Sequence, residues 1–449
     1  MITSLKKQLL PHQVLTEYAE LLNYAKDYSN NPVTLPLAVV LVESKADITT
    51  VMHWANKNNV PVTVRGAGTG KSGGGIPLQN GIVLSVEKLN KILEVDREND
   101  MVIVEPGVIL SNLKTCLSKY GLFVPLDPSS ADRCTVGGMV AENAGGSMAI
   151  KYGVTQNYVL GLSGVLGNGQ KFQFGGKLVK DVAGYNVKQL LVGSEGTLAV
   201  ISTIYLKCIP KPPEICSLWI PFNNFNDAMN CIDYAKKYNP CSAEFMQNDC
   251  IKAVQNYFDL GKDLPDANTH VLLRFDGHCR DYLESVVQQI KQMFSNAVVA
   301  DTAEKEALFW DVRYHISEAL SGISRSKVSE DITVPPSEIK TFLGFLDQLN
   351  QREVYSCIGY GHLGDGNIHV NILNINQEPE QWRKDYPQII SEVMKVCIEV
   401  GGTPSGEHGI GLSKKQFMKD FFSEPELELM KSIKTVFDPN HILNPDKIF

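Results

Sequence analysis

Two histidines, His362 and His369, lie on either side of a turn-forming run in the sequence YGHLGDGNIHVNI at residues 360–372. The two glycines and the aspartate between them weaken a helix, and on one straight strand the two rings would point to opposite faces. Glycine and aspartate are typical of turns. We therefore expect two strands joined by a turn that brings both imidazole rings together.

A second segment, PSGEHGIG at residues 404–411, supplies Glu407 and His408. Two imidazoles and one carboxylate form a site for a first-row divalent metal that keeps positions open for a substrate. His362, His369 and Glu407 are thus candidate ligands, and the set suits Zn²⁺, Mn²⁺ or Fe²⁺. Neighbouring side chains on a glycine-rich segment can point apart, so His408 can face the substrate. In the simpler alternative, these residues only stabilise turns and the start of a helix.

Three glycine-rich segments precede this pair, and the first is RGAGTGKSGGG at residues 65–75. It contains GxGxxG after a predicted strand, but the GGIP that follows does not begin the helix that a Rossmann fold requires. It also lacks the first glycine of a Walker A loop, because Arg65 stands there. Its bare backbone N–H groups can still bind a diphosphate, and the alternative is a mobile glycine loop.

The other two segments are PLDPSSADRCTVGGMVAENAGGSMAIKYG at residues 125–153 and LLVGSEGTLAVIS at residues 190–202. Small residues at this density indicate that something flat or bulky lies against the backbone. Tight turns in a packed core would explain one such segment. Three of them in one half of the chain favour a binding site for a large ligand.

The elements that must position these residues are a mixture of helices and hairpins. An amphipathic helix is expected at 46–59 and a strand at 60–66, whereas hairpins are expected at 92–107 and around the Asn168-Gly169 pair. Prolines at 210, 212 and 213 mark a domain boundary, beyond which helices are expected to cover a second sheet. The mixture indicates an α+β fold rather than regular βαβ units.

Composition excludes several classes of protein. The 449 residues carry a net charge of −8, so no general basic surface is expected for nucleic acid or anionic lipid. The N-terminal residues have no long apolar run, and we expect neither a signal peptide nor a membrane anchor. Ten cysteines are scattered without a CxxC motif, which disfavours a zinc knuckle or an iron–sulfur cluster. A cytoplasmic protein with reduced thiols is the resulting expectation.

Seven motifs in this order resemble those of the FAD-linked oxidases of the vanillyl-alcohol-oxidase type. They are VRGAGTGKSGGG, PLDPSS, TVGGMVAENAGG, KYG, VGSEGTL, GHLGDGNIH and GEHGIG. Within that group they are similar to the D-2-hydroxy-acid dehydrogenases, and the resemblance covers residues 36–449. It implies a two-part FAD-binding domain at 1–210, completed by 430–449. It also implies an α+β substrate (cap) domain at 211–429 that carries the metal site.

The resemblance assigns FAD to the glycine-rich segments, with the pyrophosphate at residues 65–74. Ala199 and Asp446 stand where the family often has glycine, which changes a backbone contact and a turn without removing FAD binding. No histidine lies in the first two segments, so non-covalent FAD is expected. The residues expected to hold FAD are Arg65, Gly66, Ala67, Gly68, Thr69, Gly70, Ser72, Gly73, Pro128, Thr135, Gly137, Gly138, Asn143, Gly145, Glu195, Gly196, Thr197, Ile201 and Asn444.

The family pattern implies oxidation of a D-2-hydroxy acid to its 2-oxo acid by hydride transfer to flavin N5. The pattern carries His362, His369 and Glu407 over as the metal ligands. It carries His408 over as the base that removes the hydroxyl proton, helped by the metal. D-2-hydroxyglutarate, D-lactate and glycolate all remain candidates, and YGHLGDGNIHVNI is most similar to the D-2-hydroxyglutarate branch.

A substrate carboxylate needs a cationic partner, and Arg313 in FWDVRYHISEAL matches the family's substrate arginine. Lys327 is the candidate for a second carboxylate. In the simpler alternative, Arg313 is a surface residue that pairs with Asp311 or Glu318.

The expected partners are the small 2-hydroxy acid and an electron acceptor, which can be a quinone, a cytochrome, an electron-transfer flavoprotein or oxygen. A homodimer and peripheral attachment at the inner membrane face both stay open. One alternative function is a flavin-binding subunit of a multi-subunit glycolate-oxidase-like complex, inactive alone. A phenol or sugar-alcohol oxidase is disfavoured by the two histidines and the glutamate, and a metal-storage or structural protein without flavin is a more distant alternative.

Overall fold

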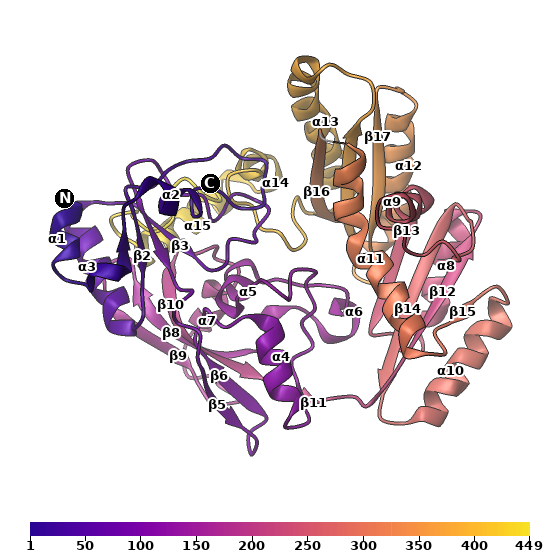
Figure 1. Ribbon diagram of the computed structural model, residues 1–449, viewed down its shortest axis with the longest axis horizontal. Coiled ribbons are helices and arrows are strands. Elements are labelled where there is room, and N and C mark those ends of the chain that lie inside the picture. Colours follow the sequence, from indigo (N-terminus) through magenta and orange to yellow (C-terminus); the bar gives the residue numbers. More distant parts are fainter. Residues whose placement is uncertain (325) are drawn as a thin grey trace. The chain divides into compact units, whose positions relative to one another are not determined.

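The computed structural model describes residues 1–324 and 326–449 (Figure 1). The chain forms two compact units, each built from separate stretches of sequence. Unit 1 comprises Met1–Ala144, Val154–Lys211 and Glu407–Phe449, and unit 2 comprises Gly145–Gly153 and Pro212–Gly406.

The first sheet of unit 1 has the strand order β1-β2-β4-β3. The last three strands run parallel, whereas β1 is antiparallel to β2. All residues of β2 and β4 are buried, as their runs of Val, Ile and Leu predict for parallel strands covered on both faces. The strands are β1 (Val14–Leu15), β2 (Ala38–Leu41), β3 (Val62–Arg65) and β4 (Ile82–Ser85).

Helix α3 (Lys45–Asn58) packs on this sheet, and its ends are set by local sequence. The Ser44 hydroxyl accepts the Asp47 N–H, and the Asp47 carboxylate accepts the Ser44 N–H, which forms a capping box. Asn59 ends the helix in the left-handed conformation, with φ of 50°. The apolar face of the helix, with Trp54, is buried in the core of unit 1.

The C-terminal tail continues the same sheet beside β3. Val62 donates its N–H to the Ile442 carbonyl at 2.7 Å, and Asn444 donates its N–H to the Val62 carbonyl at 2.8 Å. The tail follows α15 (Glu424–Phe437). The last residues of the chain are therefore part of the core of unit 1.

The second sheet of unit 1 is antiparallel, with the order β5-β6-β10-β8-β9. Its two expected hairpins form, and Gly169 with φ of 85° makes the turn between β8 and β9. The strands are β5 (Ile92–Asp96), β6 (Met101–Val104), β8 (Val159–Leu166), β9 (Lys171–Gly175) and β10 (Ala199–Lys207), and β7 (Leu122–Phe123) pairs separately with β11 (Ile209–Pro210). The remaining α-helices of unit 1 are α1 (Ile2–Lys6), α2 (Tyr18–Leu22), α4 (Leu110–Ser118), α5 (Val136–Glu142), α7 (Val187–Leu191) and α14 (Met418–Phe421).

Unit 2 is built on one antiparallel sheet with the order β15-β12-β14-β13-β17-β18-β16. Adjacent strands are mostly joined through helices, except that β17 and β18 form a hairpin. The strands are β12 (Glu214–Phe222), β13 (Ser242–Gln247), β14 (Thr269–Gly277), β15 (Val298–Val299), β16 (Lys327–Thr333), β17 (Tyr355–His362) and β18 (Asn367–Asn374).

Helices cover both faces of this sheet. On one face, α9 (Asn248–Phe258) and α11 (Ala303–Ile323) pack over Trp219, Met246 and Tyr360. The other face meets α8 (Phe225–Lys236), where Phe225 and Phe245 have ring centroids 5.9 Å apart. Further helices of unit 2 are α6 (Ala149–Tyr152), α10 (Arg280–Met293), α12 (Ile339–Asn350) and α13 (Pro379–Glu399).

The division into units differs from the expected domain boundaries at two places. Residues 407–429 belong to unit 1, where Leu412 and Ser413 donate their N–H groups to the Ser72 carbonyl at 2.9 and 3.0 Å. Gly145–Gly153 belongs to unit 2, where the Tyr152 hydroxyl donates to Asp276 at 2.6 Å. Both assignments depend on contacts between residues far apart in the sequence, which periodicity does not predict.

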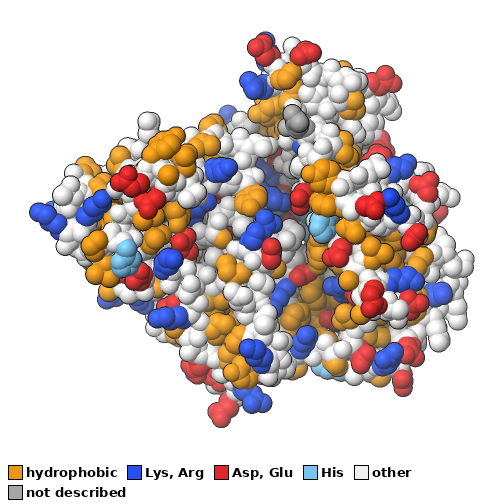
Figure 2. All heavy atoms as spheres, in the orientation of Figure 1, with side chains coloured by type: hydrophobic (Ala, Val, Ile, Leu, Met, Phe, Trp, Pro, Cys, Tyr) orange, Lys and Arg blue, Asp and Glu red, His pale blue; other side chains and the backbone are white. Residues whose placement is uncertain are grey.

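Acidic and basic side chains are interspersed over the surface that Figure 2 draws, in agreement with the modest net charge. Among the described residues, no helix has both the length and the apolar character required to cross a membrane.

Candidate functional site

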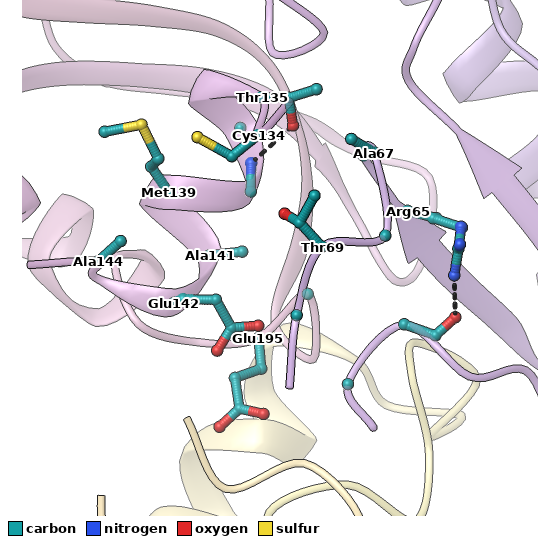
Figure 3. Close-up of a pocket in the computed structure, with 18 of the residues that line it drawn as sticks. Arg65, Ala67, Thr69, Cys134, Thr135, Met139, Ala141, Glu142, Ala144 and Glu195 are labelled. Carbon is teal, nitrogen blue, oxygen red and sulfur yellow. Dashed lines mark hydrogen bonds between the residues drawn. The ribbon is translucent and has the colours of Figure 1, made fainter. Parts of the chain in front are cut away.

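A pocket of unit 1 begins where β3 ends. The strand delivers Arg65, which is 7% exposed, and the glycine-rich loop at 66–75 follows it. The Arg65 Nη1 donates to the Gly75 carbonyl at 3.1 Å, so the arginine braces its own loop (Figure 3). Both ends of this loop line the pocket.

The start of α5 forms a second wall of the pocket. Thr135 caps this helix, because its hydroxyl accepts the Gly138 N–H at 3.2 Å. A Cβ on Gly66 would lie 2.3 Å from the Thr135 hydroxyl, and a Cβ on Gly137 would lie 2.6 Å from the Pro106 side chain. These glycines therefore allow a close approach of loop and helix that no other residue permits.

Two glutamates, Glu142 and Glu195, lie next to each other in the lining of this pocket (Figure 3). Glu195 accepts the N–H groups of Ile410 and Gly411 at 2.8 and 2.7 Å. The Glu142 Oε2 is buried without a hydrogen-bond partner. Burial and the neighbouring Glu195 raise the pKa of Glu142 well above its usual value. Burial raises the pKa of Glu195 as well, but its two N–H donors oppose this, so Glu142 is the member of the pair that keeps a proton more readily.

Most residues that the sequence assigned to FAD line this one pocket. Lining residues from that set are Arg65, Gly66, Ala67, Gly68, Thr69, Gly70, Pro128, Thr135, Gly137, Gly138, Glu195, Gly196 and Ile201. Asp27, Glu142, Glu407 and His408 also line it and were not assigned to the cofactor. Glu142 stands inside the motif TVGGMVAENAGG, so its position next to assigned residues was visible in the sequence.

Six assigned residues are not among those that line the pocket: Ser72, Gly73, Asn143, Gly145, Thr197 and Asn444. Some of them hold the lining in place instead. The Asn444 side-chain amide donates to the carbonyls of Gly74 and Glu195 at 3.0 and 2.8 Å, which ties the tail to two loops of the pocket. Gly145 belongs to unit 2.

In unit 2, the turn between β17 and β18 brings His362 and His369 together. Their ring centroids are 5.4 Å apart and the rings are nearly perpendicular, at 82°. Gly366 closes the turn with φ of 86° and donates its N–H to the His362 carbonyl at 3.1 Å. His362 is 7% exposed. The hairpin thus presents two imidazoles from neighbouring strands.

Glu244, which sequence analysis did not predict as a site residue, contacts His362. Glu244 lies opposite His362 in the β13–β17 ladder, and its Oε1 lies 2.6 Å from the His362 Nδ1. Its Oε2 accepts from the Arg313 Nε and Nη2 at 2.7 and 2.6 Å. Burial opposes the charge of Glu244, but His362 and Arg313 outweigh it and hold the pKa of Glu244 below its usual value.

Asp331, which sequence analysis also did not predict as a site residue, lies close to His369. It lies opposite His369 in the β16–β18 ladder, with 3.9 Å between Asp331 Oδ1 and His369 Nδ1. The same Oδ1 accepts from the Asn367 side-chain amide at 2.6 Å. Its Oδ2 accepts from the Ser405 hydroxyl at 3.2 Å and the Gly406 N–H at 3.0 Å. The available indication was an acidic residue in a predicted strand, where a buried carboxylate requires a partner; Glu244 is the one acid of β13, whereas Asp331 follows Glu330 in β16.

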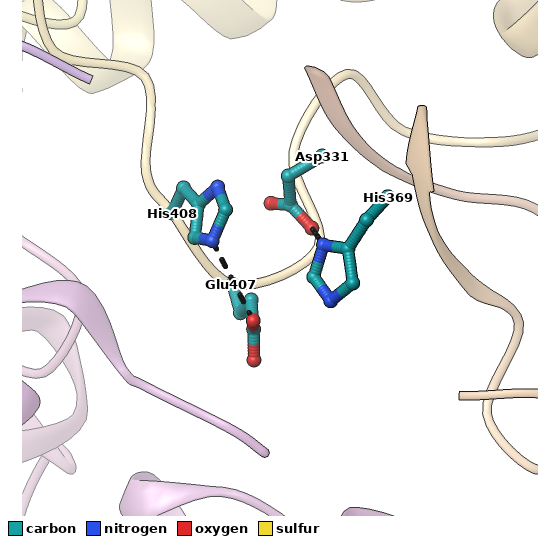
Figure 4. A group of neighbouring side chains, drawn as sticks. All are labelled: Asp331, His369, Glu407 and His408. Carbon is teal, nitrogen blue, oxygen red and sulfur yellow. Dashed lines mark ion pairs between the residues drawn. The ribbon is translucent and has the colours of Figure 1, made fainter. Parts of the chain in front are cut away.

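Glu407 and His408 follow Gly406 directly, where the chain passes from unit 2 to unit 1. Their side chains do not point apart as expected, because 3.6 Å separates the His408 Nε2 from the Glu407 Oε1. Figure 4 draws this pair and the Asp331–His369 pair, and each of the four side chains carries an atom that can bind a metal ion.

The predicted substrate cations both lie on elements of unit 2. Arg313 is buried on α11 and pairs with Glu244 rather than with Asp311 or Glu318, and its guanidinium lies 4.8 Å from the centre of the Tyr360 ring. Lys327 begins β16, and its Nζ donates to the Ser317 carbonyl at 2.8 Å.

Two family models together match most of the chain. The model of the FAD binding domain matches residues 36–175, and the model of the C-terminal domain of FAD linked oxidases matches residues 211–448. The matches of both models identify the chain as a flavin-dependent oxidoreductase. The chain belongs to the FAD-linked oxidase family.

Curated relatives match over nearly their full length. The glycolate oxidase subunit GlcD of Bacillus subtilis is 35% identical, with 100% of this chain and 97% of that protein covered. The D-lactate dehydrogenase of Archaeoglobus fulgidus is 37% identical, with 91% of this chain and 90% of that protein covered. The D-2-hydroxyglutarate dehydrogenase of Stutzerimonas stutzeri is 28% identical, with 100% of this chain and 98% of that protein covered. The solved structure of 4-ethylphenol oxidase from Gulosibacter chungangensis has the same fold, with a TM-score of 0.80 at 16% identity and coverage of 100% and 96%.

Proposed function

We propose that this protein oxidises a small D-2-hydroxy acid to the corresponding 2-oxo acid, with FAD and a divalent metal ion as cofactors. The observation that carries the proposal is the histidine pair with its carboxylates. His362 and His369 lie together, and each has a carboxylate oxygen near its Nδ1. Histidines that bind metals usually donate the other ring N–H to an acceptor, and the 2.6 Å distance between His362 and Glu244 fits such a bond. The 3.9 Å distance between His369 and Asp331 is that of an ion pair rather than a hydrogen bond.

The donor set fits a metal ion. A carboxylate at Nδ1 favours the tautomer with its proton on Nδ1, so that Nε2 carries the lone pair a metal requires. Glu407 completes the proposed set. It follows Gly406, whose N–H is bonded to Asp331, and consecutive Cα atoms are about 3.8 Å apart, so chain connectivity supports a position close to Asp331. Two imidazoles and a carboxylate suit Zn²⁺, Mn²⁺ or Fe²⁺.

The pocket of unit 1 fits a dinucleotide. Its lining contains loops with little side-chain bulk, and backbone N–H groups of such loops can bind a diphosphate. The buried Asp27 Oδ2 and Glu142 Oε2, which belong to lining residues, have no hydrogen-bond partner within the described protein, so a ligand could satisfy them. We propose non-covalent FAD in this pocket. Ser72, Gly73, Asn143, Gly145, Thr197 and Asn444 are proposed to support it.

When bound, FAD accepts a hydride and the metal ion polarises the α-hydroxyl oxygen of the substrate. An imidazole nitrogen of His408 takes the hydroxyl proton, which is a role suited to a side chain that titrates near neutral pH. His408 also lines the pocket of unit 1, which supports its placement close to the cofactor. Arg313 orients the substrate carboxylate and is itself oriented by Glu244. Lys327 is assigned to a second carboxylate, which D-2-hydroxyglutarate has and D-lactate and glycolate lack.

Among the candidate acids, the relatives favour the smaller two. The relatives named for D-lactate and glycolate are more similar to this chain than the one named for D-2-hydroxyglutarate. The acceptor of the electrons is proposed to be a quinone, a cytochrome or an electron-transfer flavoprotein.

A second candidate is a flavin-binding subunit that works only within a larger complex. One relative of full length is itself named as a subunit of glycolate oxidase, and this observation favours the alternative. The two functions differ in whether the isolated chain reduces its flavin when substrate is added.

The test is anaerobic absorbance of the purified yellow protein, with D-lactate, glycolate and D-2-hydroxyglutarate added in turn. We expect one acid to bleach the flavin. A chelator should abolish bleaching, and added Zn²⁺ or Mn²⁺ should restore it. His408→Ala should keep the yellow colour and lose bleaching. A metal-loaded protein that none of these acids bleaches would contradict the proposal and support the subunit alternative.

A further inference from the structure

We propose that Glu244 is a positioning residue that holds Arg313 and His362 as one unit, so that metal binding and substrate orientation depend on the same carboxylate. The inference rests on the proposed function, because it assigns His362 to the metal and Arg313 to the substrate. It goes beyond that function by naming a residue that touches neither ligand. Nothing in the motifs of the chain singles out Glu244.

The position of Glu244 in the sheet makes this double contact possible. It stands in register with His362 on the neighbouring strand β17, and directly opposite residues of an antiparallel pair have Cβ atoms about 5 Å apart. It shares a sheet face with Met246, which packs in the core beneath α9 and α11. Arg313 comes from α11. The Glu244 carboxylate on β13 therefore contacts both the neighbouring strand β17 and the covering helix α11.

Each oxygen of Glu244 is committed to a different partner. Oε1 lies 2.6 Å from the His362 Nδ1, and Oε2 accepts from two nitrogens of Arg313 at 2.7 and 2.6 Å. Its side chain is fully buried, so water does not replace either partner. The arginine balances the carboxylate charge.

Glutamine cannot reproduce this arrangement. Its amide offers one acceptor oxygen and one donor nitrogen, whereas His362 with a proton on Nδ1 and Arg313 both require an acceptor. If the oxygen faces Arg313, the amide N–H₂ meets Nδ1 and favours the tautomer whose proton is on Nε2, which opposes metal binding. If the oxygen faces His362, the amide N–H₂ opposes the guanidinium. Glu244→Gln should therefore weaken metal binding, substrate binding or both.

A second arginine–carboxylate pair in unit 2 provides a matched control. The Glu306 Oε1 accepts from the Arg274 Nε and Nη2 at 2.9 and 2.7 Å. The Arg274 guanidinium lies 3.8 Å from the centre of the Trp310 ring, much as Arg313 lies against Tyr360. Glu306 contacts no histidine in the described hydrogen bonds and ion pairs. Glu306→Gln thus removes a similar pair without touching the proposed ligands.

The experiment uses the full-length flavoprotein, stripped of metal by a chelator and titrated with Zn²⁺ or Mn²⁺ by calorimetry. We expect Glu244→Gln to raise the metal Kd by about 10- to 100-fold and Glu306→Gln by less than about twofold. The KM of the bleaching acid should also rise in Glu244→Gln. Glu244→Asp, which keeps the charge but shortens the side chain, should weaken metal binding as well and serves if the glutamine variant does not fold.

The outcomes separate the inference from the proposed function. Wild-type metal affinity together with a wild-type KM in Glu244→Asp and Glu244→Gln, or an equal loss in Glu306→Gln, would overturn the positioning role and leave the proposed function standing. Wild-type protein that binds no metal in the titration would overturn both.

Discussion

The indole Nε1 of Trp219 donates a hydrogen bond to the Nδ1 of His270, 3.0 Å away. Both side chains are fully buried in unit 2. Because Nδ1 accepts a hydrogen bond from Trp219, the imidazole is neutral and carries its own proton on Nε2, which lies 3.3 Å from the Asn248 side-chain oxygen. Burial lowers the pKa of His270 to about 4.

This pair predicts that the protein loses stability in acid. An unfolded histidine has a pKa of about 6.5, so between roughly pH 6.5 and 4 the unfolded chain binds more protons than the folded one. The free energy of unfolding should fall by up to about 3 kcal/mol as pH drops through this window. Urea unfolding at pH 7.5 and 4.5 measures the change. His270→Gln should reduce the difference between the two pH values, whereas His278→Gln at an exposed position of unit 2 should not.

The glycine-rich loop of unit 1 contains a residue that alanine cannot replace cheaply. Gly68 has φ of 72°, and a Cβ there would lie 2.0 Å from the Arg65 Nη2. Gly68→Ala should displace Arg65, break its bond to the Gly75 carbonyl and reduce the flavin content of the purified protein. Gly121 has nearly the same φ, 70°, with no atom within 4 Å of a Cβ. Gly121→Ala should cost about 1 kcal/mol of stability and keep the flavin, and equal flavin in both variants would contradict the prediction.

Lys434 ties the C-terminal tail to unit 1. Its Nζ donates to the carbonyls of Thr197 and Leu443 at 2.6 and 2.7 Å and pairs with Asp438, which is fully buried. Lys434→Met should destabilise the protein by about 3–5 kcal/mol, because it leaves a buried carboxylate without its cation. Lys431→Met on the same helix, which removes only an exposed pair with Glu428, should change stability by less than about 1 kcal/mol. Thermal unfolding of both variants compares them.

Glu142 should destabilise the folded apoprotein as pH rises. Its pKa is raised by burial and by Glu195, so the folded protein keeps a proton that the unfolded chain has already lost. Stability should therefore decline from about pH 5 upward until the folded pKa is passed, and Glu142→Gln should remove that decline. Melting temperatures of apoprotein at pH 6 and pH 9 test this. Glu98→Gln, at an exposed turn of the same unit, is the control, and an equal pH response in Glu142→Gln and wild type would disprove the assignment.

Sequence predicts the local parts of this molecule well. The strand that ends at Arg65 and the hairpin that joins His362 to His369 both follow from residue types within a short stretch, because turns and capped helices are set locally. The resemblance in motifs identified the family and the fold, and the family models bear both out.

What sequence did not predict depends on partners that are distant in the chain. Glu244 is the one acidic residue of β13 and Asp331 follows Glu330 in β16, and their roles appear only when the ladders pair them with histidines. Only the simpler alternative gave Arg313 a protein partner, Asp311 or Glu318 on its own helix, whereas the structure pairs it with Glu244 on strand β13. The roles of the histidines, Glu407 and Arg313 in catalysis stay predictions.

The order in which the chain is synthesised has a consequence for its folding. Unit 2 is nearly one continuous stretch, Pro212–Gly406, and emerges from the ribosome with almost all its partners. The first residues of unit 1 are made before unit 2, but β3 receives this neighbour only when Ile442 and Asn444 are made, after the whole of unit 2. The N-terminal part of unit 1 therefore stays incompletely folded, with an unpaired edge on β3, while the rest of the chain is made. During synthesis, chaperones should bind mainly this incompletely folded N-terminal part. C-terminal truncation should cause aggregation rather than yield a smaller flavoprotein.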